Sequence, residues 1–215
     1  MTQHLFLTSS IGTPGVATSI RRRLGHTRPI KTAFITTPVE SPSEQEDLSW
    51  YEADRTALRS VGFDFFDYTV TGKKSSDFIH DLAATDAIYI SGGNTRHLLK
   101  QSQLSGFIPF IRDFVNSGKL YISTSAGSII TGPQLPPYLW GEEVDVPDLT
   151  DYSAYQFVKF TFIPHWGSSG FRNLYLGGRM EQIYAENLQP FVLCNDHTYI
   201  EVIGDQYQII DVRNE

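Results

Sequence analysis

The run Ser123-Thr124-Ser125-Ala126-Gly127 carries the strongest chemical signal in the sequence. The apolar segment before it predicts a strand and the segment after it predicts a helix, so Ser125 would lie at a sharp strand-to-helix turn. Such a turn holds a serine hydroxyl at the carboxyl end of a sheet and directs backbone N–H groups toward a developing oxyanion. The small neighbours of Ser125 allow that geometry. We therefore interpret Ser125 as a nucleophile, and the alternative is an ordinary helix N-cap serine.

A second strand-to-turn junction supports this interpretation. The predicted strand Ala87–Ser91 runs into Gly92-Gly93-Asn94-Thr95. Two glycines after a strand permit close backbone approach, so the N–H of Gly93 can complement that of Ala126 in an oxyanion hole. The alternative is a nucleotide phosphate loop, although the run has neither the G-x-G-x-x-G pattern nor the Walker lysine.

A nucleophilic serine needs a base, and six histidines are available. His165 follows the predicted strand Phe157–Ile163, and the carboxyl ends of strands are where open α/β sheets gather their active sites. His165 is therefore the best candidate. His197 is a minor rival, and His97 lies inside a predicted helix, where a surface or packing role is more typical.

The base in turn needs a carboxylate to orient it. Asp196 follows the predicted strand Phe191–Cys194, in a position that matches that of His165, so the sequence predicts a Ser-His-Asp triad. The chain order also argues against an α/β-hydrolase, in which the acid precedes the histidine. The one cysteine, Cys194, lies in an apolar strand and is interpreted as a small buried hydrophobe, not as the nucleophile of an amidotransferase.

The elements that must position these residues alternate along the chain. Short β-branched and aromatic runs are separated by amphipathic stretches, which predicts an α/β fold with a mostly parallel central sheet flanked by helices in three layers. The turn Gly204-Asp205 predicts an antiparallel hairpin at the C-terminal end of the sequence. The predicted strands are Leu5–Thr8, Lys31–Thr36, Asp64–Thr69, Ala87–Ser91, Lys119–Ser123, Phe157–Ile163, Phe191–Cys194, Thr198–Ile203 and Tyr207–Asp211.

Helix boundaries follow from capping signals. Ser43 and Glu46 form a capping-box pattern for a helix that ends near Arg59, and Asn94 is placed to cap a helix that carries Leu98 and Leu99. Gly62 and Gly118 predict helix ends. A further helix is expected over Phe171–Glu186.

The segment from Thr131 to Tyr155 is the least regular stretch, with four prolines and several acidic and aromatic residues. It predicts a long loop over about residues 131–155, and loops of this length tend to be functional, so it is expected to border the active site. The alternative is a solvated acidic insertion.

Length and composition limit the class of protein. The 215 residues suit a single domain, residues 1–215, and the formal net charge of -7 argues against a nucleic-acid partner. No apolar run reaches the roughly 18 to 20 residues that a membrane helix needs. A single cysteine cannot form an internal disulfide, and no leader pattern opens the sequence, so a cytoplasmic location is expected.

Together these motifs resemble the serine peptidase family that contains peptidase E, the aspartyl dipeptidase, and cyanophycinase, within the class I glutamine amidotransferase-like fold. The resemblance spans nearly the whole chain. It implies Ser125 as nucleophile, His165 as general base, Asp196 as the acidic third member where peptidase E has glutamate, and Gly93 and Ala126 as the oxyanion hole. It rests on Leu5–Ser10, Gly92–Thr95 with Leu98 and Leu99, Ser125–Gly127, Pro164-His165 and Asn195-Asp196.

The resemblance also implies a substrate class. Peptidase E takes short peptides with an N-terminal aspartate, whose carboxylate needs a facing cation. Arg179, which matches an arginine of the family pattern, leads Arg172 for that role, and Asn94 is a further substrate-binding candidate. The alternative for Arg179 is a surface arginine paired with Glu181 or Glu186. Ser91 stands where the family has glycine, and the 131–155 segment does not reproduce the acidic segment of peptidase E.

These observations lead to the expectation of a peptidase that acts on short peptides through an acyl-enzyme. It would use no metal and no cofactor, and a homodimer is a possible assembly. The rival from another class is a non-catalytic module that kept the fold and binds a small molecule or a protein.

Overall fold

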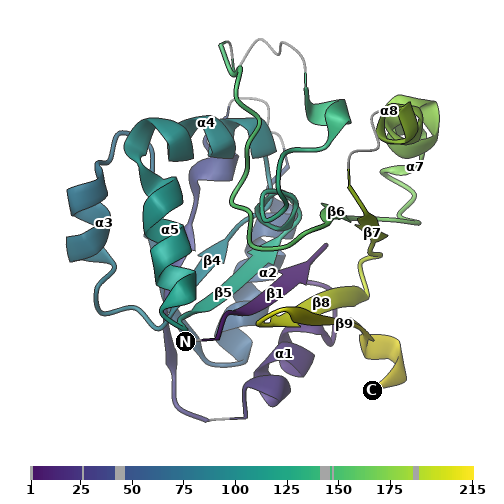
Figure 1. Cartoon of the computed structure of the whole chain (residues 1–215). Helices are drawn as coiled ribbons and strands as arrows, with labels where there is room; N and C mark the ends of the chain where they lie inside the picture. Colours follow the sequence, from purple (N-terminus) through teal and green to yellow (C-terminus); the bar gives the residue numbers. More distant parts are fainter. Residues whose placement is uncertain (1, 26, 42–46, 141–145, 147, 186–188) are drawn as a thin grey trace.

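A computed structural model of the chain describes residues 2–25, 27–41, 47–140, 146, 148–185 and 189–215. Seven strands form one sheet in the order β3-β2-β4-β5-β1-β8-β9 (Figure 1). The first five strands of this order are parallel, whereas β8 pairs antiparallel with both β1 and β9. The strands are β1 (His4–Thr8), β2 (Ile30–Ile35), β3 (Phe63–Tyr68), β4 (Ala87–Ile90), β5 (Leu120–Thr124), β8 (Thr198–Ile203) and β9 (Gln206–Asp211). The predicted parallel sheet and C-terminal hairpin are therefore confirmed.

The two faces of the sheet bury different helices, because successive side chains of a strand point to opposite sides. Leu5 and Leu7 of β1 join a core cluster that includes residues of α3, α4 and α5, whereas Phe6 joins a second cluster with α1 and α2. The result is the predicted arrangement of three layers, visible in Figure 1. The helices are α1 (Val16–Leu24), α2 (Ser49–Ser60), α3 (Ser75–Asp81), α4 (Thr95–Ser105) and α5 (Phe107–Asn116), and short 3-10 turns occupy Thr37–Val39 (η1) and Val212–Asn214 (η5).

A second, two-stranded parallel sheet lies apart from the main one. It consists of β6 (Thr161–Ile163) and β7 (Phe191–Leu193). The predicted strand Phe157–Ile163 is therefore wrong in its first half. The N–H groups of Phe157 and Val158 both donate to the carbonyl of Thr131, so a loop, and not a neighbouring strand, satisfies this part of the backbone.

The helix ends that glycine predicted are confirmed. Gly62 and Gly118 have φ of 86° and 84°, and their N–H groups donate back to the carbonyls of Arg59 and Val115. The helix start is different from the prediction, since α2 begins at Ser49; the capping-box residues Ser43 and Glu46 lie outside the described residues.

The helix expected over Phe171–Glu186 is interrupted. It divides into α7 (Arg172–Leu174), the π-helical turn η4 (Tyr175–Arg179) and α8 (Met180–Ala185). Gly178, with φ of 152°, makes the kink, because glycine accepts a conformation there that other residues rarely adopt. Glu186 lies outside the described residues.

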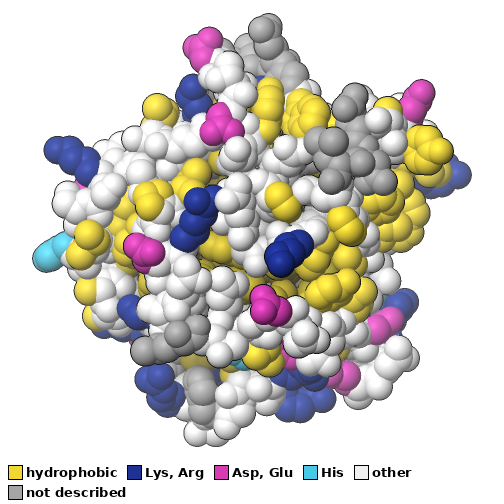
Figure 2. All heavy atoms as spheres, viewed as in Figure 1, with side chains coloured by type: hydrophobic (Ala, Val, Ile, Leu, Met, Phe, Trp, Pro, Cys, Tyr) yellow, Lys and Arg dark blue, Asp and Glu magenta, His cyan; other side chains and the backbone are white. Residues whose placement is uncertain are grey.

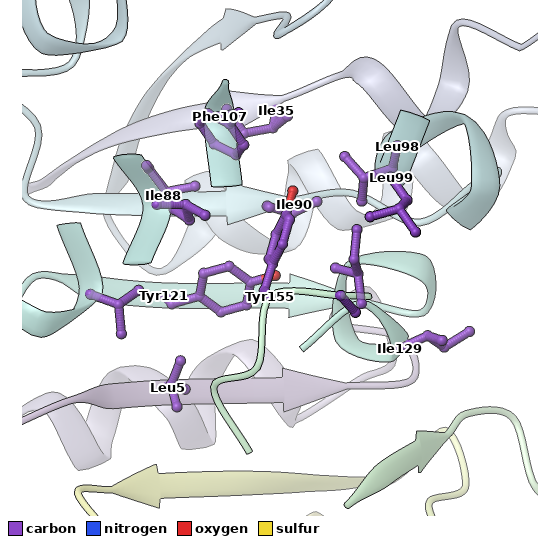
Figure 3. Packing of buried hydrophobic residues seen from close by; sticks show 14 of the residues in the cluster. Leu5, Ile35, Ile88, Ile90, Leu98, Leu99, Phe107, Tyr121, Ile129 and Tyr155 are labelled. Carbon is purple, nitrogen blue, oxygen red and sulfur yellow. The ribbon is translucent and has the colours of Figure 1, made fainter. Parts of the chain in front are cut away.

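The 131–155 segment is a loop, as predicted, and its described part packs against the core at both ends, whereas Asp148, Thr150, Asp151 and Ser153 are exposed. Beyond the short turn η3 (Pro137–Leu139), one bridge joins Gln134 to Ser153. Tyr155 is fully buried and lies with Ile90 and Tyr121 in the main core (Figure 3). The acidic residues Glu142, Glu143 and Asp145 lie outside the described residues.

The surface in Figure 2 shows lysine and arginine side chains dispersed among acidic and apolar ones, without one broad basic patch on this face. Apolar side chains gather over the segment α7–η4–α8, where Leu174, Leu176 and Tyr184 are exposed. In the described part of the chain, no helix has the length and apolar character needed to cross a bilayer.

Candidate active site

Ser125 lies at the sharp turn between β5 and the short helix α6 (Ala126–Ile129). Its φ of 48° and ψ of −105° are unusual for a residue with a side chain, and such conformations persist only where the surroundings enforce them. The Ser125 N–H donates to the carbonyl of Thr8 at 2.9 Å. A Cβ on Gly127 would meet the Ile90 carbonyl oxygen at 2.5 Å, so the turn can approach β4 only with glycine there.

The three residues of the predicted triad are brought together. Ser125 Oγ lies 3.0 Å from His165 Nε2, and His165 Nδ1 lies 2.7 Å from Asp196 Oδ1. These are the distances at which an imidazole can take a proton from a hydroxyl on one side and be oriented by a carboxylate on the other. His97 is occupied elsewhere, with Nε2 3.7 Å from Glu40 Oε2.

The orientation of His165 is set by contacts that the sequence did not reveal. Its backbone N–H donates to Ser9 Oγ at 3.1 Å, and that hydroxyl donates to the carbonyl of Cys194 at 3.0 Å. The ring of Phe171 stacks on the imidazole with centroids 4.3 Å apart. Backbone and ring are thus held independently, which keeps the imidazole directed at Ser125.

The predicted oxyanion-hole groups lie at the ends of adjacent strands. Gly93, after β4, has φ of 119°, and a Cβ there would meet the Pro38 carbonyl oxygen at 2.5 Å. A Cβ on the preceding Gly92 would lie 3.4 Å from Ser125 Cβ, which shows how closely this loop approaches the serine. Within the described residues, the N–H groups of Gly93 and Ala126 have no hydrogen-bond acceptor, so both can donate to a ligand.

A cavity of about 850 Å³ opens over this cluster. That volume suits a small ligand. Its walls include Tyr138 and Leu139, so the 131–155 loop borders the cavity as predicted. The other lining residues are Ser9, Ser10, Trp50, Asp54, Gly92, Gly93, Asn94, Thr95, Arg96, Thr124, Ser125, Ile129, Pro164, His165, Phe171, Tyr175 and Arg179.

The three predicted substrate-binding residues occupy different places. Arg179 lines the cavity, where its guanidinium carbon lies 4.7 Å from the ring centre of Tyr138. Within the described part of the chain it has no ion pair, and Glu181 does not hold it. Arg172 is exposed and does not line the cavity. Asn94 lines it and also caps α4, since its Oδ1 accepts the His97 N–H at 2.8 Å as the capping prediction required.

Asp54 is a lining residue that sequence reasoning missed. Its side chain is buried on α2, and burial raises the pKa of this carboxyl to about 6. A signal was present, because Asp54 shares the buried face of α2 with Tyr51 and Leu58, and a carboxylate on an apolar helix face is unusual.

The chemistry of the remaining groups is limited by burial and spacing. Burial raises the pKa of the Cys194 thiol to about 11, which agrees with a small buried hydrophobe. Within the described ranges, no cluster of three or more histidine, cysteine, aspartate or glutamate side chains is arranged to hold a metal ion.

Comparisons with known proteins show the family of the chain. The model of peptidase family S51 matches residues 5–210. An uncharacterized peptidase of Listeria monocytogenes is 30% identical over 170 residues, which cover 78% of this chain and 82% of that protein. Peptidase E of Shewanella denitrificans is 26% identical over 132 residues, covering 61% of this chain and 53% of that enzyme.

A solved structure extends the similarity to the whole fold. The crystal structure of a Listeria monocytogenes EGD-e protein, described as a candidate peptidase E, has a TM-score of 0.84 and 25% sequence identity. The match covers 98% of this chain and 99% of that one. The chain therefore belongs to peptidase family S51, a family of serine-type peptidases.

Proposed function

We propose that Ser125, His165 and Asp196 hydrolyse a peptide bond of short peptides. The observation that carries the proposal is the continuous hydrogen-bond chain from Ser125 Oγ through the His165 ring to Asp196, with separations of 3.0 and 2.7 Å. His165 Nε2 takes the Ser125 proton as Oγ attacks the carbonyl carbon, and Asp196 stabilises the imidazolium that forms.

The remaining steps use groups around the same cavity. The N–H groups of Gly93 and Ala126 donate to the oxyanion of the tetrahedral intermediate. The imidazolium then gives its proton to the leaving amine, and an acyl-enzyme on Ser125 remains. Water, deprotonated by His165, attacks this ester, and the acid product leaves as the proton returns to Ser125.

Covalent labelling with a fluorophosphonate, read by intact-protein mass, tests the nucleophile. We expect the wild type to gain one adduct, Ser125→Ala to gain none, and His165→Ala to react far more slowly. Ser117→Ala, at the end of α5 and remote from the cavity, is the matched control and should label as the wild type does. A wild type that never labels would favour the alternative of a non-catalytic binding module.

For the substrate, we propose dipeptides with an N-terminal aspartate whose carboxylate faces Arg179. Support comes from the position of Arg179 in the cavity wall and from the relatives named peptidase E. A guanidinium can meet a carboxylate with two parallel hydrogen bonds, which a neutral side chain cannot accept.

A panel of Asp-X, Glu-X, β-aspartyl and neutral dipeptides tests this selectivity. We expect Asp-X to be cleaved best, and Arg179→Ala to raise KM for Asp-X by roughly tenfold or more while neutral dipeptides change little. Arg172→Ala should leave the pattern of the wild type. Equal cleavage of Asp-X by the wild type and Arg179→Ala would rule out the proposed contact.

A further inference from the structure

Asp54 is a buried carboxylate that the proposed triad does not use. It is 1% exposed and is the one carboxylate among the described residues that line the cavity. In the described part of the chain, no lysine or arginine pairs with it. Burying a carboxylate without a cation is costly unless hydrogen bonds compensate, so its contacts indicate why it is there.

One carboxylate oxygen connects Asp54 to the strand that carries the serine. The Tyr89 hydroxyl donates to Asp54 Oδ2 at 2.7 Å, and the same hydroxyl lies 2.9 Å from Thr124 Oγ1. Tyr89 is fully buried on β4, and Thr124 is the last residue of β5, directly before Ser125. This arm ends one residue from the proposed nucleophile.

The other oxygen connects Asp54 to the loop that supports the histidine. The Gly12 N–H donates to Asp54 Oδ1 at 2.8 Å, and the neighbouring Ile11 N–H donates to Thr124 Oγ1 at 3.2 Å. The same loop carries Ser9, which accepts the His165 N–H at 3.1 Å. A Cβ on Gly12 would lie 2.9 Å from Asp54 Oδ1, so the loop is pressed directly against α2.

We propose that Asp54 is a positioning residue that aligns the Ser125 turn with the His165 support loop. Its two oxygens hold one donor from each side, and Thr124 joins the two arms. In Asp54→Asn one of the two acceptor oxygens becomes an N–H donor, so the hydrogen bond on that side must reverse or break. The two halves of the site would then shift relative to each other. This inference rests on the proposed function of Ser125 and His165.

The variants Asp54→Asn, Tyr89→Phe and the double mutant test the inference with the best dipeptide of the panel and with the fluorophosphonate. We expect each single change to lower kcat and the labelling rate by roughly tenfold, because small misplacements of reacting groups are costly, while KM changes less than twofold. The double mutant should lose little more than either single mutant, because both changes interrupt the same hydrogen-bond chain.

Asp67→Asn is the matched control. Asp67 lies on β3 with an exposed side chain, and it pairs with Arg55, the neighbour of Asp54 on α2, at 2.6 Å. We expect this variant to keep the kcat of the wild type. A role of Asp54 in folding alone would lower the unfolding midpoint and leave kcat of the folded protein unchanged, and that result would overturn the inference.

Other outcomes are equally decisive. Losses that appear in KM alone, or that add fully in the double mutant, would also overturn it. If Asp54→Asn does not fold, the kcat of Tyr89→Phe, which keeps the buried ring, decides. A roughly tenfold lower kcat supports the positioning role of Asp54, and an unchanged kcat overturns it. The proposed function fails separately, when the wild type does not label or Ser125→Ala still labels. A failure of this inference alone leaves the wild type labelled, Ser125→Ala unlabelled and Asp54→Asn fully active.

Discussion

At the scale of single residues, burial changes the pKa of Asp54, and the change can be measured through the pH dependence of the free energy of unfolding. Burial raises the pKa of Asp54 from 3.8 to about 6 in the folded protein, with Tyr89, Thr124 and the Gly12 N–H opposing part of that shift and the nearby His165 charge also lowering it. Between pH of about 4 and 6, the folded state therefore binds more protons at this site than the unfolded state does.

The sign of the effect follows from that difference. The stability contributed by the raised pKa is fully present below pH of about 4 and is lost as pH rises through about 6, by ~3 kcal/mol in total. We expect the free energy of unfolding of the wild type to fall by this amount relative to Asp54→Asn over that window. Urea denaturation of both proteins at pH 4, 5, 6 and 7 measures it, because every other titrating group is common to the two proteins and cancels in their difference. Parallel curves for the two proteins would contradict the prediction.

The contact between Asp196 Oδ1 and His165 Nδ1 gives a second prediction at the scale of single residues. In Asp196→Asn the carboxylate that faces His165 Nδ1 becomes a neutral amide, which can no longer stabilise the imidazolium. We expect kcat to fall by a factor on the order of 10³ to 10⁴ with a small change in KM, measured by steady-state kinetics. Asp205→Asn, in the turn between β8 and β9, should behave as the wild type. A loss below tenfold would remove Asp196 from the proposed triad.

At the scale of elements, the backbone shape of the loop after β4 positions the N–H proposed for the oxyanion hole. Gly93 combines a φ of 119° with an approach to the Pro38 carbonyl oxygen that leaves no room for a Cβ. In Gly93→Ala the loop must move away from η1, and the N–H proposed for the oxyanion hole moves with it. We expect kcat to fall by roughly 10² or more, since a single oxyanion donor is worth about that factor.

Gly72→Ala is the control for this prediction. It separates the strain of placing a side chain at positive φ from the displacement of the N–H in the proposed oxyanion hole. Gly72 also has positive φ, at 73°, but a Cβ there would meet nothing within 4 Å. It should therefore lose about 1 kcal/mol of stability without loss of kcat. Thermal melts and kinetics on both variants make the comparison. Equal kcat in the two variants would show that the Gly93 N–H does not take part in the reaction.

At the scale of the whole molecule, the 131–155 loop is part of the main core. Tyr155 is fully buried in the core (Figure 3). Its hydroxyl lies 2.8 Å from Ser102 Oγ on α4, and the Arg112 guanidinium donates to its carbonyl at 2.9 Å. The wall that Tyr138 and Leu139 give to the cavity is thus anchored through the same packing that stabilises the sheet.

Tyr155→Ala tests that coupling. We expect the free energy of unfolding to fall by about 3 to 5 kcal/mol, because the substitution leaves a large cavity and removes the partner of Ser102. Urea denaturation measures this loss, and Tyr184→Ala, on the exposed surface of α8, should change stability by less than about 0.5 kcal/mol. Similar small effects in both variants would mean that the loop contributes little to the core.

Several features were predictable from the sequence because local interactions determine them. Periodicity and turn residues predicted the strands of the main sheet and the hairpin around Gly204, and Asn94 caps its helix within three residues of its own position. The small neighbours that permit the turn at Ser125 are visible in the sequence, although contacts with Thr8 and β4 hold the turn in place. The family resemblance, carried by the same short motifs, is confirmed by the match to family S51.

Other features depend on contacts between residues far apart in the chain. No local pattern could show that Phe157 and Val158 would bond to Thr131 in place of a strand. The 3.0 Å approach of His165 to Ser125 joins residues 40 positions apart, and the contact of Ile11 with Thr124 spans 113.

By itself, the sequence therefore determined which residues stand at the ends of strands with the chemistry of a serine hydrolase, since side-chain type and local backbone preference are properties of short segments. Only the tertiary structure decided which of them meet, which of the two candidate arginines, Arg172 and Arg179, lines the cavity, and that a buried aspartate on α2 lies beneath the site. The physical reason is that distance and desolvation depend on how separate elements pack, and that packing is the sum of many long-range contacts.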